Sequence, residues 1–487
     1  MRKLTAIYFG AAVLLLASAC TKNIDQLDTN PKAPVTVPAA SLFLAGEKNL
    51  SDNTTSPGGG LDPFRNFAQT WTECTYITEA RYILTAYDAP DNWWNYLYGA
   101  ANQLGVLSNF YNAKSLFPTY AGSADILKND LIITDIMEIY TYYLLVNTYG
   151  NIPYTQAESR SIPFPKYDDA KTIYTDLLTR LDTCIADINT DSTVGAMGKE
   201  DVIYKGNCKA WKKFAATLKL KMAMLLADID PSTAGTKAQE AVATGVFTAN
   251  ADNAQFPYDG SNVTNSNPIW QAAVNSGRHD NCPASTLVNQ MVSWNDPRLP
   301  LYFTLAPDNT YKGGVPGTGN SYPTLSTFSN RVIAATLPGD LLDYSETEFL
   351  LAEAVERGFN VGGTAEQHYD NAVTASIEYW GGSSGDAATY LAQPSVAYST
   401  AAGDYKQKIG YQKWIALWNR AWDAWTEIRR LGQPDINVIN PPVGAITPLP
   451  LRFWYPLSEQ SANPSNYAAA VGAMGPDLVT TKLFWMP

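Results

Sequence analysis

The segment between Lys408 and Pro434, KIGYQKWIALWNRAWDAWTEIRRLGQP, constrains the fold more than any other part of the sequence. Its apolar residues recur at steps of three or four, which is the period of one face of an α-helix. Two arginines precede Gly432, and arginine followed by glycine is typical of a helix C-terminus. The pattern predicts a helix over 411–431 with four tryptophans on one face, namely Trp414, Trp418, Trp422 and Trp425.

A face with four tryptophans is too apolar to remain in water. Each side chain can bury on the order of 150–250 Å². The stripe is therefore interpreted as part of a core, or as a surface that docks a partner. A cradle for sugar rings is a third interpretation of the same residues, although a stripe at helical spacing is more often packing.

The N-terminus resembles a bacterial lipoprotein signal. Arg2 and Lys3 precede a short apolar stretch, and small residues at 17–19 precede Cys20. The apolar stretch is shorter than a membrane-spanning helix needs. We expect residues 1–19 to be a signal peptide, Cys20 to carry the lipid, and the polar, proline-containing residues 20–60 to form a tether with a short helix near 39–50. An ordinary secretory signal is the alternative.

Composition excludes several classes of function. The formal net charge is −12, so nucleic acid is a poor partner and membrane attachment would come from the lipid. Only two histidines are present, and we expect no metal and no cofactor. The remaining cysteines, Cys74, Cys184, Cys208 and Cys282, form no CxxC pair and are either buried thiols or include one disulfide; the sequence leaves both possibilities open.

The rest of the chain predicts an all-α fold: one domain over 61–487 with helical patterns in series. These patterns cover 64–84, 92–113, 124–149, 168–188, 207–229, 237–243, 344–357 and 365–380. Two pairs, near 124–188 and 344–380, resemble tetratricopeptide units, in which small residues allow close helix packing. The plain helical hairpin is the alternative. Residues 245–340 are rich in Asn, Gly, Pro and aromatic residues, and we expect them to be long irregular loops that build a ligand surface.

Motifs for catalysis are weak. Gly381–Gly385 fits G-x-S-x-G, but it follows a predicted helix and no histidine lies downstream. Asp187–Ser192 opens like a calcium loop but lacks the turn glycine and the closing glutamate. Pairs of carboxylates for glycoside hydrolysis cannot be recognised by spacing. The sequence therefore favours a protein that is not an enzyme.

Several segments together resemble the SusD/RagB-like family of nutrient-binding outer-membrane lipoproteins. They are Cys20 with LDTNPKAP after it, VNTYGNIPYTQA at 146–157, KAWKKFAATLKLKMAMLLAD at 209–228, NDPRLPLYF at 295–303, FLLAEAVERGF at 349–359, QKWIALWNRAWDAWTEIRRLGQP at 412–434 and LRFWYPLSEQSAN at 451–463. They follow the family's order over nearly the whole chain. The resemblance implies a helical scaffold of tetratricopeptide-like pairs whose loops bind a ligand.

The same resemblance implies the function. We expect a lipid-anchored outer-membrane protein at the cell surface that binds glycans or similar nutrients and delivers them, without catalysis, to a SusC-like TonB-dependent barrel. The family's ligand platforms correspond here to Arg81, Trp93, Trp94, Tyr258, Trp270 and Tyr322. Trp93 and Trp94 could equally begin a buried helix. A tetratricopeptide-like scaffold that binds proteins, or a surface glycoside hydrolase, remains the alternative function.

Overall fold

The computed structural model describes residues 37–57, 63–100, 103–119, 123–159 and 161–487. Residues 39–487 form one compact unit, and the following description concerns this unit. The predicted signal peptide and Cys20 lie outside the described residues. None of the described helices is both long enough and apolar enough to cross a lipid bilayer.

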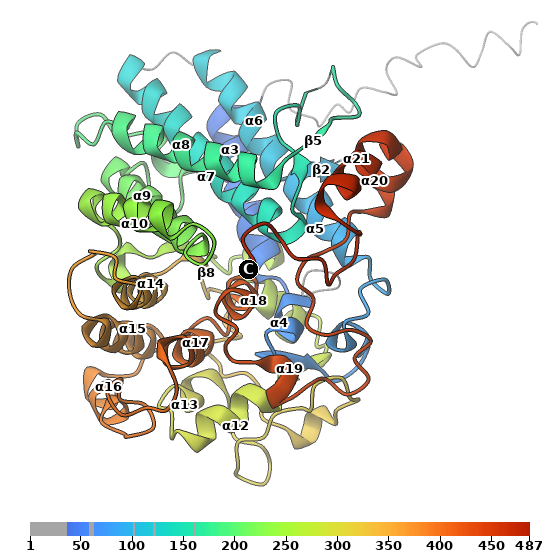
Figure 1. Ribbon diagram of the computed structural model, residues 1–487, viewed down its shortest axis with the longest axis vertical. Coiled ribbons are helices and arrows are strands. Elements are labelled where there is room, and N and C mark those ends of the chain that lie inside the picture. Colours follow the sequence, from blue (N-terminus) through green and yellow to red (C-terminus); the bar gives the residue numbers. More distant parts are fainter. Residues whose placement is uncertain (1–36, 58–62, 101–102, 120–122, 160) are drawn as a thin grey trace, which may run out of the picture. The chain divides into compact units, whose positions relative to one another are not determined.

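Helices make up most of the unit, as expected (Figure 1). They are α3 (Ala39–Thr55), α4 (Pro63–Phe67), α5 (Ala89–Tyr98), α6 (Val106–Leu116), α7 (Ala124–Tyr149), α8 (Ala170–Asp187), α9 (Cys208–Leu225), α10 (Pro231–Thr244), α11 (Pro268–Trp270), α12 (Ser285–Ser293), α13 (Leu299–Tyr302), α14 (Tyr344–Glu356), α15 (Ala365–Tyr379), α16 (Ser384–Leu391), α17 (Tyr405–Ala416), α18 (Ala421–Leu431), α19 (Ile436–Ile439), α20 (Leu457–Ala462) and α21 (Pro464–Met474).

The strands of the described residues are short and form antiparallel pairs. β1 (Trp71–Glu73) pairs with β7 (Asn281–Pro283), β2 (Gly99–Ala100) with β3 (Gln103–Leu104), β4 (Ile152–Pro153) with β5 (Tyr167–Asp168), and β6 (Ala254–Phe256) with β8 (Gly339–Leu342). The β2–β3 and β4–β5 pairs join segments that are close in the sequence, and the β6–β8 pair joins the two ends of the central insertion. The β1–β7 pair instead joins the start of the unit to the middle of the chain.

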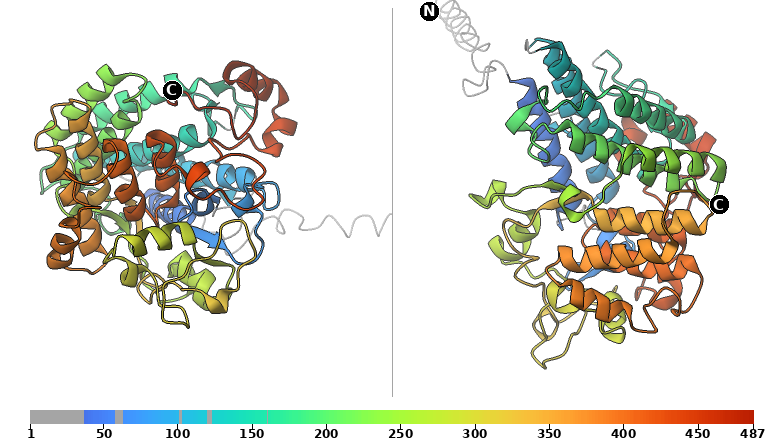
Figure 2. Two further views of the ribbon diagram at one scale, coloured as in Figure 1. Left: turned by 60° about the horizontal axis from the view of Figure 1, so that its bottom comes forward. Right: turned by 90° about the vertical axis from the view of Figure 1, so that its left-hand side faces the viewer.

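Both expected helix pairs are present. α7 packs against α8, and α14 packs against α15, while α9 and α10 form a further pair between them. Figure 1 shows these helices following one another down one side of the unit, and the right-hand view of Figure 2 looks onto that side. Side-chain caps start the helices: Asp169 accepts from the Thr172 N–H at α8, and Thr364 forms a capping box with Gln367 at α15. The arrangement is consistent with tetratricopeptide-like packing.

The predicted tryptophan helix is broken. α17 ends at Ala416 and α18 begins at Ala421, with a turn between them. In this turn the Asn419 side-chain oxygen accepts a 2.9 Å hydrogen bond from Arg65, and Arg420 pairs with Asp343 and Glu346 at 2.8 and 2.9 Å. Tertiary contacts of the turn's side chains therefore replace the helical continuation that the periodicity alone indicated.

Burial in the core is confirmed as the role of the tryptophan stripe. All four tryptophans are buried, and three indole N–H groups donate to backbone or side-chain oxygens of distant segments. The acceptors are Ala68 O for Trp414 at 2.7 Å, Thr148 Oγ1 for Trp422 at 2.9 Å and Pro450 O for Trp425 at 2.7 Å. The stripe thus ties α17 and α18 to three other parts of the unit, and in this structure it is available neither to a partner nor to a sugar.

Three other predicted helices are wrong in extent. The pattern at 237–243 is only the second half of α10, because this helix already begins at Pro231, and proline is tolerated in the first turn. The other two differ more. The pattern at 64–84 becomes the short α4, then β1 and a loop, because β1 finds its hydrogen-bonding partner in β7. The pattern at 92–113 is split between α5 and α6 by the β2–β3 hairpin, where Gly99 has a φ of 125° that favours glycine. Both errors arise because periodicity cannot detect a distant strand or a glycine-directed turn.

The tether and the insertion also differ from the expectation in detail. α3 is a 17-residue helix, and its Phe43 and Leu50 are buried in the core, so this part of the expected tether belongs to the folded body. The region 245–340 contains long irregular segments, but short helices and strands interrupt them. Tyr302, Phe303 and Phe328 from this region are buried and pack around Trp418.

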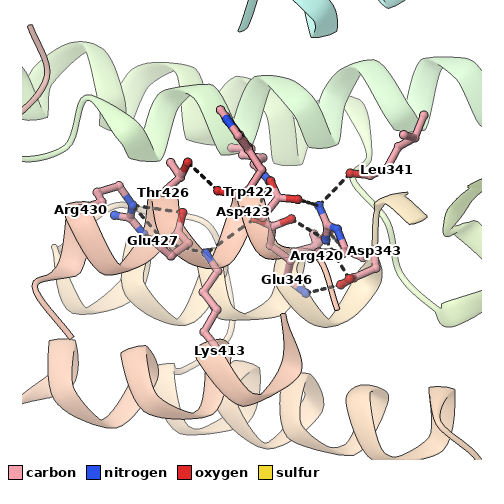
Figure 3. Close-up of polar contacts among 12 residues, drawn as sticks. Leu341, Asp343, Glu346, Lys413, Arg420, Trp422, Asp423, Thr426, Glu427 and Arg430 are labelled. Carbon is pink, nitrogen blue, oxygen red and sulfur yellow. Dashed lines mark hydrogen bonds and ion pairs between the residues drawn. The ribbon is translucent and has the colours of Figure 1, made fainter. Parts of the chain in front are cut away.

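Behind the tryptophans, a network of buried ion pairs joins α9, α14, α17 and α18. Lys221 of α9 pairs with Glu346 of α14 at 2.7 Å and with Asp423 of α18. Arg430 of α18 pairs with Glu353 of α14 and with Glu427, each at about 2.5–2.6 Å. Figure 3 shows how the charged side chains of α18 meet those of its neighbours. The charged side chains of this network therefore each lie beside an opposite charge in a region from which water is excluded.

The network sets the ionisation of its carboxyl groups. Burial alone would raise the pKa of Glu427, but the charges of Arg430 and Lys413 outweigh it and lower this pKa to about 2. The pKa values of Glu346 and Glu353 are lowered in the same way by their cationic neighbours, against the effect of burial. Asp423 differs, since burial raises its pKa above the usual value.

We predict that Trp418→Ala lowers the free energy of unfolding by about 3–5 kcal/mol, because the indole is fully buried among other aromatic rings. Urea unfolding followed by circular dichroism measures the change. Val438→Ala, at a side chain that is 76% exposed, is the control and should change stability by less than about 0.5 kcal/mol. Equal effects of the two substitutions would contradict a core role for Trp418.

We predict that the protein loses stability in acid. Because the folded-state pKa of Glu427 is about 2 and its ordinary value is 4.5, its contribution is complete above about pH 4.5 and disappears as the pH falls toward 2. Glu346 and Glu353 act with the same sign, and Asp423 opposes them. Glu427→Gln should be less stable at pH 7 and lose less stability on acidification, as measured by urea unfolding from pH 7 to 3. Parallel pH profiles for the two proteins would contradict this assignment.

Candidate functional site

A cavity of about 530 Å³ opens where segments far apart in the sequence meet. One part of the lining is β1 with the loop that follows it as far as Tyr87, and beside it lie residues 278–281, which lead into β7, the strand paired with β1. Pro57, α11, the π-helix η6 (Gln271–Asn275), Tyr322 and Phe328 complete the lining. The volume lies within the range of roughly 300–1,000 Å³ that is typical of small-molecule sites.

Three tyrosines present their rings to this cavity: Tyr76, Tyr87 and Tyr322. The rings of Tyr76 and Tyr87 meet edge to face with centroids 6.4 Å apart, and the side chain of Tyr76 is 60% exposed. Tyr322 stacks on His279 at 4.2 Å with nearly parallel rings. Tyr76 has a φ of 58°, which is uncommon for a residue with a side chain, and such backbone conformations cluster at ligand sites.

Charged and polar groups lie between the rings. Glu73 and Glu79 line the cavity, and a Glu73 carboxylate oxygen accepts a 3.1 Å hydrogen bond from the Ala80 N–H. Arg278 pairs with Asp280, and its guanidinium lies 5.7 Å from the centre of the Tyr76 ring. Thr75 donates to Asp280 at 2.8 Å, so a side-chain hydrogen bond joins the segment after β1 to the segment before β7.

The hydroxyl groups of Tyr87 and Tyr322 remain protonated near neutral pH. Burial, followed by the negative charges of Glu73 and Glu79, raises the pKa of Tyr87. Burial also raises the pKa of Tyr322. Each of these two hydroxyl groups can therefore donate as well as accept a hydrogen bond. The side-chain amide of Asn281, which also lines the cavity, can donate and accept hydrogen bonds too.

The inner wall of the cavity is continuous with the hydrophobic core. Trp71 stacks on Phe328 at 4.0 Å, both line the cavity, and Arg65 covers the Trp71 ring at 4.3 Å. The Trp71 and Phe328 rings lie 6.3 and 6.4 Å from that of Trp418, in the turn between α17 and α18. The site is therefore anchored to the core rather than carried by loops alone.

A second, smaller cavity of about 240 Å³ lies along the same short helices. Pro268 and Gln271 line it, whereas Ile269, Ala272 and Ala273 line the larger cavity. Its other residues are mainly polar and include Asn49, Asn53, Asn95 and Tyr96. The helical segment 268–273 thus contributes side chains to both cavities.

The structure places the predicted ligand residues in different environments. Tyr322 lines the larger cavity. Trp270 is half-buried in α11, between residues that line the two cavities. Arg81 belongs to the same short helical turn as Glu79, Glu79–Arg81, but its Nε donates to Gly317 O at 2.8 Å. These three residues are at or near the candidate site.

Trp93, Trp94 and Tyr258 are core residues in this structure. Their exposed fractions are 1%, 5% and 4%. The Trp93 ring contacts that of Phe64 at 4.9 Å, and Trp94 packs against Tyr98 and Tyr149. The Tyr258 hydroxyl donates to Asp52 at 2.8 Å. A ligand role for these three residues finds no support in the structure, because packing already covers their rings. For Trp93 and Trp94 the structure shows what the sequence analysis gave as the alternative, the buried start of a helix.

Sequence reasoning missed Tyr76, Tyr87, Glu73, Glu79 and Arg278. Glu73, Tyr76 and Glu79 were hidden because the pattern at 64–84 predicts one helix, which leaves no loop for a ligand to contact, and Tyr87 lies between two predicted helices without a motif of its own. The thin apolar periodicity after Glu73 and the Asp88–Pro90 turn signal could have indicated that loop. Arg278 and Asp280 lay within the insertion expected to bind ligand but carried no local motif.

The chemistry of the cavity suits binding. Among the described residues, no group of three or more His, Cys, Asp or Glu side chains is arranged to hold a metal ion. Ring faces, hydroxyl groups, an amide and carboxylates are the groups that contact polyhydroxylated ligands with apolar faces.

Solved structures resemble the chain over nearly its whole length. A chitin-binding protein is 26% identical with a TM-score of 0.77, and the match covers 92% of this chain and 99% of that one. A chitin-binding SusD homologue from Flavobacterium johnsoniae is 25% identical with a TM-score of 0.76, covering 91% and 98%. A SusD-like protein from Bacteroides thetaiotaomicron is 25% identical with a TM-score of 0.76, covering 92% and 99%.

The sequence was also compared with curated proteins and with family models. No curated protein matches the chain. A family model described as SusD-like, "Starch-binding associating with outer membrane", matches residues 31–456, which is most of the sequence. The chain therefore belongs to the SusD-like family.

Proposed function

We propose that this protein binds an oligosaccharide in the cavity lined by Tyr76, Tyr87 and Tyr322 and delivers it, without catalysis, to a TonB-dependent outer-membrane barrel. Acylation of Cys20 would hold the protein at the outer membrane, at the cell surface. The observation that carries this proposal is the cavity itself, with its exposed rings and interleaved polar groups.

The geometry matches the surface of a sugar. A pyranose has an apolar face, which stacks on an aromatic ring, and a rim of hydroxyl groups, which need donors and acceptors. Here Tyr76 offers an exposed ring, and Asn281 and the carboxylates lie within the same cavity. Tyr322 and Trp270 stay in the proposal as further ligand residues, with Arg81 supporting the adjoining turn.

The family adds support. Its model is described as starch-binding and associated with the outer membrane, and two of the similar solved structures are described as chitin-binding. Starch and chitin are both polymers of pyranose rings. We therefore place glycans first among the candidate ligands.

A glycoside hydrolase is the second candidate, because Glu73 and Glu79 line the same cavity. Two carboxylates flanking a bound sugar are the minimal machinery of such an enzyme. The scaffold hypothesis has weaker support, since the tryptophan stripe that would dock a protein partner is buried.

Isothermal titration against a panel of starch, chitin and other oligosaccharides tests the proposal directly. Binding by at least one glycan, with that glycan recovered intact after prolonged incubation, is the expected result. Recovery of shortened products that disappears in Glu73→Gln or Glu79→Gln would instead establish the hydrolase. Absence of binding across glycans, peptides and glycoconjugates would refute the proposal.

We predict that Tyr76→Ala weakens binding of that glycan by up to about tenfold, since one aromatic stacking contact is worth roughly 0.5–1.5 kcal/mol. Titration calorimetry at neutral pH measures the affinity. Phe164→Ala is the matched control, because Phe164 is 56% exposed, close to the 60% of Tyr76, and does not line the cavity. Equal losses for both variants would show that the cavity is not the binding site.

We also predict that the full-length protein, purified from detergent-solubilised outer membranes, brings a TonB-dependent barrel with it. Cys20→Ala should be lost from the membrane fraction, because it cannot be acylated at this position. Immunoblots of membrane and soluble fractions, with mass spectrometry of the co-purified bands, provide the measurement. A membrane-bound Cys20→Ala protein would argue against the lipid anchor, and absence of any barrel would argue against the delivery step.

A further inference from the structure

Two of the four described cysteines meet across the β1–β7 ladder. Thr72 of β1 lies opposite Cys282 of β7, and Cys74 follows β1, where its N–H donates to the Asp280 carbonyl at 2.5 Å. Side chains directly opposite each other in an antiparallel pair point to the same face, and so do residues two apart on one strand. Cys74 and Cys282 therefore project from the same face of the ladder as diagonal neighbours.

The two thiols share one apolar environment. Cys74 is 5% exposed and Cys282 is fully buried, and they form a small cluster with Leu325, against which Tyr322 packs. Gly314 lies beside this cluster, where an added Cβ would come within 2.6 Å of the Cys282 sulfur. Room for this sulfur thus depends on a glycine at position 314.

The other two cysteines have different surroundings. The Cys184 thiol of α8 lies 3.5 Å from an Asp135 carboxylate oxygen, and the Cys208 sulfur of α9 accepts a 3.1 Å hydrogen bond from Asn129. Neither is in the cluster that contains Cys74 and Cys282. They provide an internal control for any oxidation of the first pair.

We propose that Cys74 and Cys282 form a disulfide that joins β1 to β7 in the wall of the ligand cavity. The inference rests on export, which is part of the proposed function, because disulfides persist in oxidising compartments. The oxidant would be a protein disulfide of a thiol oxidoreductase. One cysteine thiolate attacks the oxidant's disulfide and releases a thiol, and the second thiolate then attacks the mixed disulfide and releases the other. Two protons and two electrons pass from the cysteine pair to the oxidant, which becomes a dithiol.

The bond would form before the ladder closes. In the folded protein the neighbouring Cys74 and burial raise the pKa of Cys282, so little of the reactive thiolate is present. The oxidant also cannot reach two buried sulfurs. During folding, however, each thiol is exposed and reacts normally, and the closed ladder afterwards protects the product from reduction.

The position of the cross-link connects it to ligand binding. Glu73 and Thr75 flank Cys74, Asp280 and Asn281 precede Cys282, and all four flanking residues line the cavity. Without the bond, these walls are joined by a short ladder and by the hydrogen bond from Thr75 to Asp280. A covalent link would fix the separation of the two walls and restrict the unfolded chain over a long loop.

Peptide mapping of the full chain tests this proposal. The protein is purified from the cell envelope and unfolded in denaturant that contains iodoacetamide, so that every free thiol is exposed and blocked, and it is then digested without reduction. We expect a cross-linked peptide pair containing Cys74 and Cys282, with Cys184 and Cys208 alkylated. Alkylation of both Cys74 and Cys282 in envelope-derived protein would overturn the proposal. This result does not depend on any ligand, so it is separate from a failure of glycan binding.

Thermal unfolding with and without a reductant gives a second readout. Reduction should lower the Tm of the wild type by on the order of 5 °C, because it removes the cross-link that restricts the unfolded chain. The double variant Cys184→Ser/Cys208→Ser should respond in the same way. Cys74→Ser/Cys282→Ser should show no such response. A wild-type Tm that is unaffected by reduction at denaturing temperatures, where the pair is accessible, would also count against the bond.

Discussion

The burial of α18 is the constraint on which the rest of the structure depends. Nearly all of this helix is inside the unit, so both its apolar and its charged face need partners. Trp422 and Trp425 occupy the apolar side, and Asp423, Glu427 and Arg430 face counter-charges from α9, α14 and α17. An unpaired charge at this depth would cost several kcal/mol, so these helices are held in one arrangement relative to one another.

The same region supports the candidate site. Trp418, in the turn that precedes α18, packs against Tyr302 and Phe328 from the central insertion. Phe328 in turn stacks on Trp71, and both line the cavity. The rings that line the cavity are therefore supported from behind by close-packed aromatic residues. Such support suits a binding protein, because a rigid wall loses little conformational entropy when a ligand arrives.

The cavity combines two distant parts of the chain. One part of its lining follows β1 near the start of the unit, and another belongs to the segment of the insertion that leads into β7. The π-helix η6 lies beside the cavity and also borders the smaller polar one. π-Helices are rare in proteins, and those that do occur are often found at functional sites. The groups that line the cavity thus come both from the insertion and from β1 with the loop after it, while the stacked helices provide the frame.

Local sequence determined the helices whose signals lie within them. The patterns of α7, α14 and α15 predicted those helices within two residues, because apolar period, N-terminal cap and closing glycine agree. The sequence also required the tryptophan stripe to be covered, by a core or by a partner, because of its apolar area, and the structure decided for the core. The resemblance to SusD-like proteins, carried by segments along the whole chain, indicated the family that the family model then showed.

Only the tertiary structure decided where α17 ends and α18 begins, which aromatic residues are free, and where the cavity lies. Trp94 and Tyr76 are both aromatic residues within predicted helices, yet one is packed among four other rings and the other is 60% exposed. The difference depends on residues such as Tyr149 and Tyr455, which are distant in sequence. Pairing of β1 with β7, and with it the approach of Cys74 to Cys282, is of the same kind, because hydrogen bonds between distant strands leave no local periodicity.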